Sequence, residues 1–114
     1  MGFKTKVRKK GKGIQVLEIS GDFAGENASK AAVLLEEMRT STEGGIAVDL
    51  KRTTFIDSVG LEALLVLYGE ALALGGEIKV SAPTEIGRDI LKATRLQSVI
   101  EVHPSTPEAR RSFV

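Results

Sequence analysis

The chain has 114 residues, 42% of them hydrophobic, which suffices for one domain with its own core and leaves no room for a second. The absence of cysteine excludes a disulfide framework, a thiolate zinc site and a cysteine nucleophile. The single histidine, His103, argues against a histidine-based metal site. Because no apolar run has the length of a membrane span and no signal peptide is visible, we expect a cytoplasmic protein with no membrane partner, metal or cofactor.

The net charge of +1 is unevenly distributed along the chain. Residues 1–12 carry six of the sixteen lysines and arginines and no acid, so residues 13–114 contain the other ten basic residues and all fifteen acids. A nucleic-acid-binding domain is usually basic over its body, and its basic segments often carry aromatic side chains that stack on bases. Neither feature occurs here. We therefore expect no nucleic-acid partner and interpret the basic segment as an exposed edge strand, whose lysines discourage aggregation.

The first half of the chain predicts a hairpin and then a helix. Residues 3–10 alternate loosely, Gly11-Lys12-Gly13 is typical of a turn, and the apolar residues of 14–20 predict a second strand that ends at Gly21. Apolar side chains then recur at helical spacing over 26–40. Since the two strands are joined by a short turn, we expect them to pair with each other.

The central part of the chain predicts a strand and a strongly apolar helix. Residues 46–50 are apolar except for Asp49, the polar residues 51–54 interrupt them, and Phe55-Ile56 restores the apolar character. Asp57-Ser58 ends this segment, and the helix follows at about 59–74. The apolar face of that helix is broader than packing on a sheet requires. It leaves two interpretations open: coverage by the same chain, or contact with a second copy in a weak homodimer.

The remainder continues the alternation of strands and helices. We expect a strand at 77–81, a helix at about 84–94 with Thr84 as its N-cap, a short strand at 99–102, and a final short helix after the capping-box pattern 105–108. Alternation of this kind predicts an α/β fold. The sequence therefore predicts one domain over 1–114, with a mixed, mostly parallel sheet of about four to five strands covered by about four α-helices.

The segment Asp57-Ser58-Val59-Gly60-Leu61 is the focal point for function. It lies where a buried strand meets the start of a helix, and ligands gather beyond the carboxyl ends of the strands in α/β sheets. Asp57 and Ser58 are ordinary helix caps on one interpretation. On the other, Ser58 is a regulatory phosphorylation site, because the free N–H groups and partial positive charge of a helix N-terminus tolerate a phosphate.

The run VDLKRTTFIDSVGLEALL (48–65) resembles the signature of STAS domains, named for sulphate transporters and anti-sigma-factor antagonists. Ile19-Ser20-Gly21 is similar to the strand-ending glycine ahead of the family's first helix, and the Gly75–Val80 segment to the strand after its second. Leu96 and Val99-Ile100 resemble the end of the family's domain. The resemblance covers about residues 14–113 and implies a STAS-like single domain.

Small members of that family resemble anti-sigma-factor antagonists, and the resemblance implies a regulatory switch and no enzyme. Ser58 is the implied phospho-acceptor, and the implied partners are an anti-sigma factor with serine kinase activity and a phosphoserine phosphatase. The expected partner-binding residues lie around Ser58 and after Gly21: Asp22, Phe23, Asp57, Ser58, Val59, Gly60 and Glu62. Many relatives have an aspartate where this chain has Ala24. That departure leaves a stressosome-type or other STAS scaffold role as the alternative.

Two further classes of function have weaker support in the sequence. Ser58, His103 and Asp57 supply the residue types of a hydrolase triad, but the residue two before Ser58 is Ile56, so the Gly-x-Ser-x-Gly elbow is absent. Asp57 adjoins Ser58 in the sequence, an awkward place from which to orient a histidine. No Walker-type phosphate-binding run occurs, so specific nucleotide binding is not expected. We therefore predict no catalytic residue.

Overall fold

The structure is a computed structural model that describes residues 2–9, 13–41 and 44–113. Its elements are, in chain order, β1 (Lys4–Lys9), β2 (Ile14–Phe23), α1 (Gly25–Ser41), β3 (Gly45–Ile56), α2 (Ser58–Leu74), β4 (Ile78–Ser81), α3 (Glu85–Ala93), a 3-10 turn (Leu96–Ser98), β5 (Val102–His103) and α4 (Thr106–Ser112). This is the predicted alternation of strands and helices. Among the described residues, no helix combines the length and the apolar character needed to cross a bilayer.

The five strands form one mixed sheet in the order β1-β2-β3-β4-β5. β1 and β2 form the predicted antiparallel hairpin, with Lys4 opposite Ser20, while Gly11 and Lys12 of the expected turn lie outside the described residues. The other neighbours are parallel, and β2 and β3 remain paired as far as Phe23 and Ile56. The predicted mostly parallel α/β sheet is therefore confirmed.

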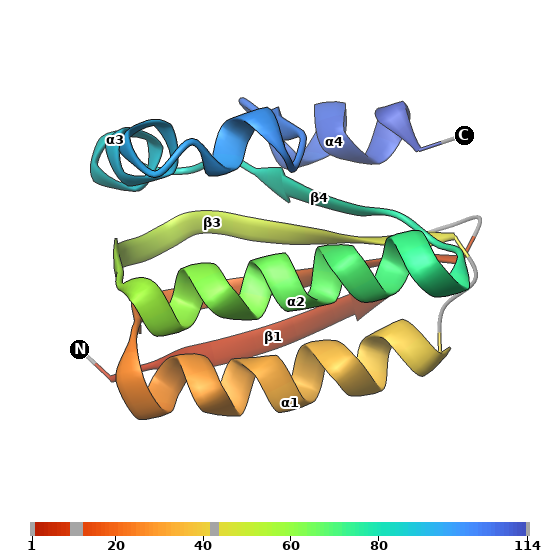
Figure 1. Ribbon diagram of the computed structural model, residues 1–114, viewed down its shortest axis with the longest axis horizontal. Helices are drawn as coiled ribbons and strands as arrows, with labels where there is room; N and C mark the ends of the chain where they lie inside the picture. The colour runs from red at the N-terminus through yellow and green to blue at the C-terminus, as the bar shows by residue number, and fades with distance from the viewer. Residues whose placement is uncertain (1, 10–12, 42–43, 114) are drawn as a thin grey trace.

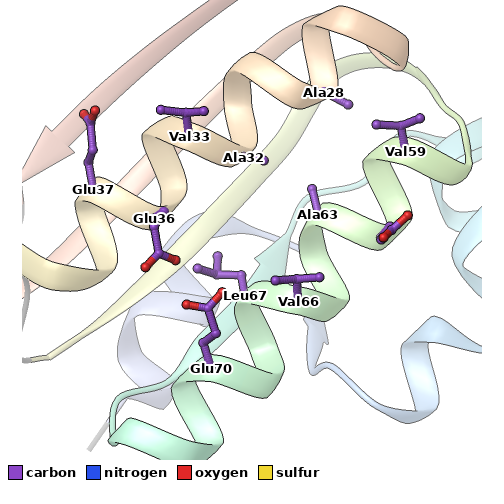
Figure 2. A pocket seen from close by; sticks show the side chains of 11 residues that line it. Ala28, Ala32, Val33, Glu36, Glu37, Val59, Ala63, Val66, Leu67 and Glu70 are labelled. Atoms are coloured by element: carbon purple, nitrogen blue, oxygen red, sulfur yellow. The ribbon is translucent and has the colours of Figure 1, made fainter.

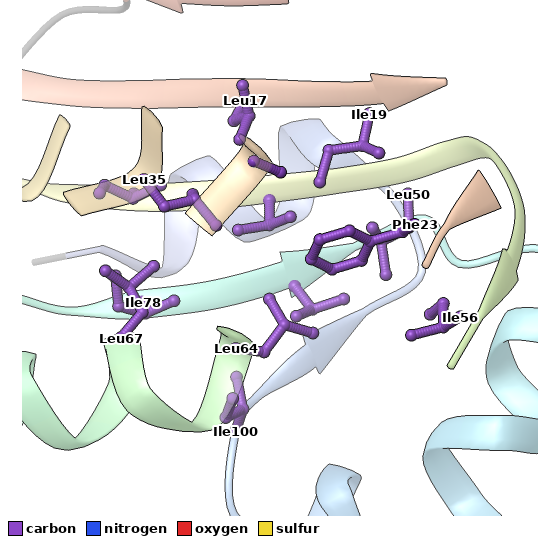
Figure 3. Close-up of a cluster of buried hydrophobic side chains, with 14 of the residues drawn as sticks. Leu17, Ile19, Phe23, Leu35, Leu50, Ile56, Leu64, Leu67, Ile78 and Ile100 are labelled. Carbon is purple, nitrogen blue, oxygen red and sulfur yellow. The ribbon is translucent and has the colours of Figure 1, made fainter. Parts of the chain in front are cut away.

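Helices pack on both faces of the sheet (Figure 1). α1 and α2 run side by side on one face, over strand residues such as Leu17, Val48 and Val80, and enclose the main core (Figure 3). α4 packs on the opposite face, where Ala109 and Phe113 join a smaller cluster of strand side chains. Alternate side chains of the central strands thus belong to two different cores, as the period of a β-strand requires.

The polar segment 51–54 does not interrupt a strand, and this prediction was wrong. β3 is one continuous strand from Gly45 to Ile56, and β2 continues beside it past Gly21, its predicted end, to Phe23. Lys51, Arg52 and Thr54 are exposed at this end of the sheet. Arg52 pairs with Ser20 of β2, whereas Lys51 and Thr54 lie at two register shifts in the β2–β3 pairing. Polar side chains mark an uncovered surface here.

The last predicted strand is also displaced. Residues 99–102 were expected to be extended, but the chain forms the 3-10 turn Leu96–Ser98 and pairs only at Val102–His103. The turn folds the chain back, with the Ile100 N–H donating to the Leu96 carbonyl at 3.0 Å. Both side chains enter the main core as a result.

Lys79 is the unexpected member of the smaller core. Its side chain lies on the α4 face of β4 and is only 3% exposed. The Lys79 ammonium group donates to the Ser112 carbonyl at 3.0 Å and hydroxyl at 2.8 Å, and lies 4.7 Å from the centre of the Phe113 ring. Glu77 and Glu101 lie at 3.5 and 3.4 Å and balance its charge. One cation thereby fixes the end of α4 to the sheet.

Replacing this cation should loosen α4. We expect Lys79→Ala to lower the free energy of unfolding by about 1–3 kcal/mol, because the partly buried Ser112 carbonyl loses its donor. Urea unfolding measures the change, and Lys92→Ala, at an exposed lysine of α3, serves as the control. Equal urea midpoints for the two variants would contradict the anchoring role.

Candidate functional site

The candidate site forms where the parallel strands β2 and β3 end side by side. Phe23 and Ile56 are the last paired residues, so the turn through Ala24 into α1 and the turn through Asp57 into α2 lie at the same edge of the sheet. This edge is the carboxyl end of both strands, which is where α/β sheets usually bind their ligands.

Asp57 joins the two turns. One oxygen of its carboxylate accepts hydrogen bonds from the N–H groups of Val59 at 2.9 Å and Gly60 at 3.0 Å, which makes Asp57 the N-cap of α2. The other oxygen accepts from the N–H of Gly25, the first residue of α1, at 3.0 Å. A single carboxylate therefore fixes the starts of two helices relative to each other.

These hydrogen bonds favour the charged form of Asp57. The pKa of Asp57 is lowered, first by the N–H of Gly60 and then by those of Gly25 and Val59, against the opposing effect of desolvation. The carboxylate is therefore ionised at neutral pH and combines with the partial positive charge of the helix start.

Gly60 lets α2 approach the end of β2 closely. A Cβ atom at this position would come closer than 3.0 Å to the Phe23 carbonyl oxygen, a separation that Cβ atoms essentially never show. The same carbonyl accepts the Asp57 N–H at 3.4 Å. Glycine is needed here because the backbone of α2 lies against the backbone of β2.

Ser58 is the first residue of α2, and it is exposed to solvent. The expectation that its neighbouring N–H groups stand free is not met, since the Asp57 carboxylate already accepts those of Val59 and Gly60. Asp57 is thus the cap, and Ser58 is not. A group attached to the Ser58 oxygen would project from the surface.

The other predicted partner-binding residues divide into accessible and buried ones. Val59 and Glu62 are exposed on the first turns of α2. Asp22, next to the last residue of β2, is also exposed, and its carboxylate accepts a hydrogen bond from the Thr54 hydroxyl at 2.6 Å. Phe23 differs from the expectation, because its side chain is fully buried and only its backbone carbonyl takes part in the site.

Sequence reasoning did not identify Phe55 as a surface residue of this site. Its ring is 47% exposed, whereas the neighbouring Ile56 is 2% exposed. The signal was present in the alternation of a strand, since two adjacent apolar residues cannot both point into one core. Phe55, near the end of β3, and Val59, in the first turn of α2, are therefore two exposed apolar side chains close to Ser58 in the sequence.

The hydrolase interpretation has no support in the geometry. The Asp57 carboxylate is engaged with three backbone N–H groups, and the His103 imidazole lies 3.0 Å from Glu101 on β5's side of the sheet. Neither group is directed to Ser58 as a triad would require.

The lowered pKa of Asp57 predicts a pH-dependent effect of Asp57→Asn. We expect the variant to unfold at lower urea concentration than the wild type at about pH 7, because an amide offers one acceptor oxygen where the carboxylate offers two. The carboxylate contributes fully above the ordinary aspartate pKa of about 3.9, and its contribution is lost as the pH falls through the lower folded value. The difference in urea midpoint between the wild type and Asp57→Asn should therefore be smaller at about pH 3 than at about pH 7. A gap that is constant with pH would contradict this role.

The close approach at Gly60 predicts a second stability effect. Gly60→Ala should lower the free energy of unfolding by about 1–3 kcal/mol, because the methyl group overlaps the Phe23 carbonyl. Gly69→Ala lies in the same helix with nothing within 4 Å of its Cβ position. For that control, the free energy of unfolding should rise by about 0.5–1 kcal/mol, because alanine has the higher helix propensity. Thermal unfolding of the two variants therefore separates the overlap with the Phe23 carbonyl from the effect of helix propensity.

Comparison with solved structures places this fold among known proteins. An anti-sigma factor antagonist from Mycobacterium paratuberculosis is 22% identical, with a TM-score of 0.87 over 97% of this chain and 93% of that one. The anti-sigma factor antagonist SpoIIAA in its unphosphorylated form is 16% identical, with a TM-score of 0.78 over 93% and 92%. The Bacillus cell fate determinant SpoIIAA in its phosphorylated form is 15% identical, with a TM-score of 0.72 over 95% and 97%.

At these identities the structural likeness establishes the fold alone. The family is established independently by the sequence, because the STAS domain model matches residues 5–109. That match spans the sheet from β1 onward and includes the whole edge formed by Phe23, Asp57 and Ser58. The chain belongs to the STAS domain family.

Proposed function

We propose that this STAS domain is an anti-sigma factor antagonist that acts as a protein-binding switch in the cytoplasm. Unphosphorylated, it binds an anti-sigma factor with serine kinase activity and so frees a sigma factor for transcription. Phosphorylated on Ser58, it releases that partner, and a phosphoserine phosphatase restores the binding form. The observation that carries the proposal is an exposed serine at the start of a helix whose cap is a different residue.

The capping arrangement supports a switch that leaves the fold intact. Because Asp57 holds the N–H groups of Val59 and Gly60, the hydroxyl of Ser58 has no structural task in the cap. A phosphate there adds roughly 1.5–2 negative charges next to the Asp57 carboxylate and one helical turn from Glu62. A partner docked on this edge would meet both the repulsion and the cost of desolvating the phosphate.

The relatives support the same proposal. Two of the solved structures of similar fold are named anti-sigma factor antagonists, and SpoIIAA is described in an unphosphorylated and a phosphorylated form. The expected binding surface of this chain comprises the accessible residues of the edge: Asp22, Phe55, Ser58, Val59 and Glu62.

One residue favours a second function. Ala24 lies between Phe23 and Gly25, both of which contact the Asp57–Gly60 turn, so the aspartate common in relatives would stand beside Asp57. Without that charge, a stressosome-type or other STAS scaffold role is the alternative. In that role the edge binds a partner protein, and the affinity for that partner stays the same when Ser58 is modified.

A pair of variants tests the switch. From extracts of the native cell, we expect immobilised Ser58→Ala to retain a partner that itself binds a sigma factor, and Ser58→Asp to lose it, because the added charge mimics the phosphate. Both variants should melt within a few degrees of the wild type, because the site is a solvent-exposed helix end. Equal capture by both would contradict the switch and favour the scaffold role.

The modification itself is tested by mass spectrometry of the protein from its native cell. We expect phosphate on Ser58 and none on Thr53, because Thr53 is 1% exposed and its hydroxyl donates to the Ile19 carbonyl at 2.8 Å. Thr54 is exposed like Ser58, but its hydroxyl donates to Asp22, so phosphate on Thr54 is the outcome to compare with phosphate on Ser58. Phosphate confined to Thr54 would contradict the assignment of Ser58.

A further inference from the structure

A groove of about 610 Å³ runs between α1 and α2, and the switch does not use most of it. Figure 2 shows Ala28 and Val59 at one end of the groove and Glu36 and Glu70 facing each other at the other. Since Val59 directly follows Ser58, the first end opens at the switch. The second end lies more than two helical turns away, along both helices.

The groove is hollow because small residues line it and both ends of the helix pair are fixed. Ala28, Ala32 and Ala63 leave the space between the two helices unfilled. At one end the Asp57 carboxylate binds the start of α1, and at the other Arg39 of α1 contacts Glu70 of α2 at 3.2 Å. The helices therefore cannot close over the space without breaking one of these two contacts.

The walls of the groove are apolar and open to water. Val33 on α1 is 62% exposed, and Val66 and Val59 on α2 are 51% and 37% exposed. Contiguous apolar side chains that face water across a concave surface are typical of protein docking sites. The geometry of two helices flanking an apolar trough suits a third helix in particular.

The rim of the groove is acidic. Four glutamates line it, at positions 36, 37, 62 and 70, while Arg39 is the base that contacts two of them, which leaves a net charge of −3. Glu36 and Glu70 face each other, and the proximity of the Glu36 carboxyl group raises the pKa of Glu70, while the hydrogen bond from Arg39 lowers the pKa of Glu36. Two carboxyl groups held together in this way favour a further cation.

We propose that this groove is a second docking site, for a basic amphipathic helix of a partner protein. The apolar face of such a helix would lie on Val33, Val59 and Val66, and its lysines or arginines would meet the glutamates of the rim. From Ala28 to Glu37 the groove is about 14 Å long at 1.5 Å per residue, which accommodates roughly nine residues of helix. Charge complementarity thus selects a basic helix over an acidic or neutral one.

The proposed site is separable from the phosphorylation switch. A negative charge at position 58 adds to the acidic rim, so it should leave the binding of a basic helix unchanged or make it tighter. The proposed function predicts the opposite effect of Ser58→Asp on the anti-sigma factor. The two proposals can therefore fail independently.

The test uses a fluorescein-labelled synthetic helix of about fourteen residues, with leucines on one face and lysines on the other, and its glutamate counterpart with the same leucines. Fluorescence polarisation at physiological salt should show binding of the lysine peptide and none of the glutamate peptide. The amide and methyl NMR signals of Ala28, Ala63 and Val66 should shift on titration.

Matched variants locate the binding. The double variant Val33→Ser/Val66→Ser should weaken the binding of the lysine peptide about tenfold or more, because two apolar side chains are lost from the interface. Leu72→Ser, at a leucine of α2 that is 68% exposed and outside the groove, should not. Glu37→Lys should weaken binding about two- to fivefold, as expected for a rim charge, and Asp89→Lys on α3 should weaken it less.

Three results would overturn the inference. These are equal binding of the two peptides, equal effects of the groove variants and their controls, or peptide-induced shifts confined to other elements. Sedimentation of the protein without peptide tests whether a second copy of the chain occupies the groove. If the wild type forms a dimer that Val33→Ser/Val66→Ser dissociates, the groove is a self-association surface and the basic-helix assignment is wrong. All variants alter exposed side chains, so circular dichroism should give wild-type spectra.

Discussion

The carboxylate of Asp57 is the interaction on which the rest of the site depends. It accepts hydrogen bonds from the first turn of α2 and from Gly25, the first residue of α1, which is 32 residues before Asp57 in the chain. With that contact in place, Gly60 can lie against the Phe23 carbonyl, and α1 and α2 start side by side. The exposure of Ser58 follows, because the residue before it has taken over the cap.

The same contact defines the groove between the two helices. Asp57 fixes their first turns, and Arg39 connects their later turns through Glu36 and Glu70. A pair of helices held at both ends need not fill the space between them, so alanines suffice at its floor. The switch residue and the acidic groove are therefore two parts of one arrangement, with the exposed Val59 between them.

Much of this fold could be predicted from the sequence, because its signals are local. Periodicity marked the helices, glycines marked several element ends, and the caps at Thr84 and Ser105 are present as expected, with the hydroxyls accepting from Gly87 and Glu108. The errors at 51–54 and at 99–102 share one cause. Polarity reports which side chains meet water, and apolarity which are buried, but neither decides whether the backbone pairs with a neighbouring strand.

The site was harder to predict than the fold, for a physical reason. Asp57 and Ser58 are both good capping residues, and only the direction of each side chain in three dimensions separates the cap from the exposed neighbour. The burial of Lys79 likewise depends on the carbonyl of Ser112, 33 residues away. The acidic groove combines side chains from two helices, so no single stretch of sequence contains its pattern.

β1 has a different relation to the rest of the domain. All six of its side chains, from Lys4 to Lys9, are exposed, and it is held mainly by its backbone pairing with β2. Arg8 also forms a salt bridge with Glu18. Packing therefore imposes almost no volume constraint on this strand, so substitutions can accumulate there without disturbing the interior. Its run of lysines is free to diverge under whatever selection acts on solubility or on contacts with other molecules.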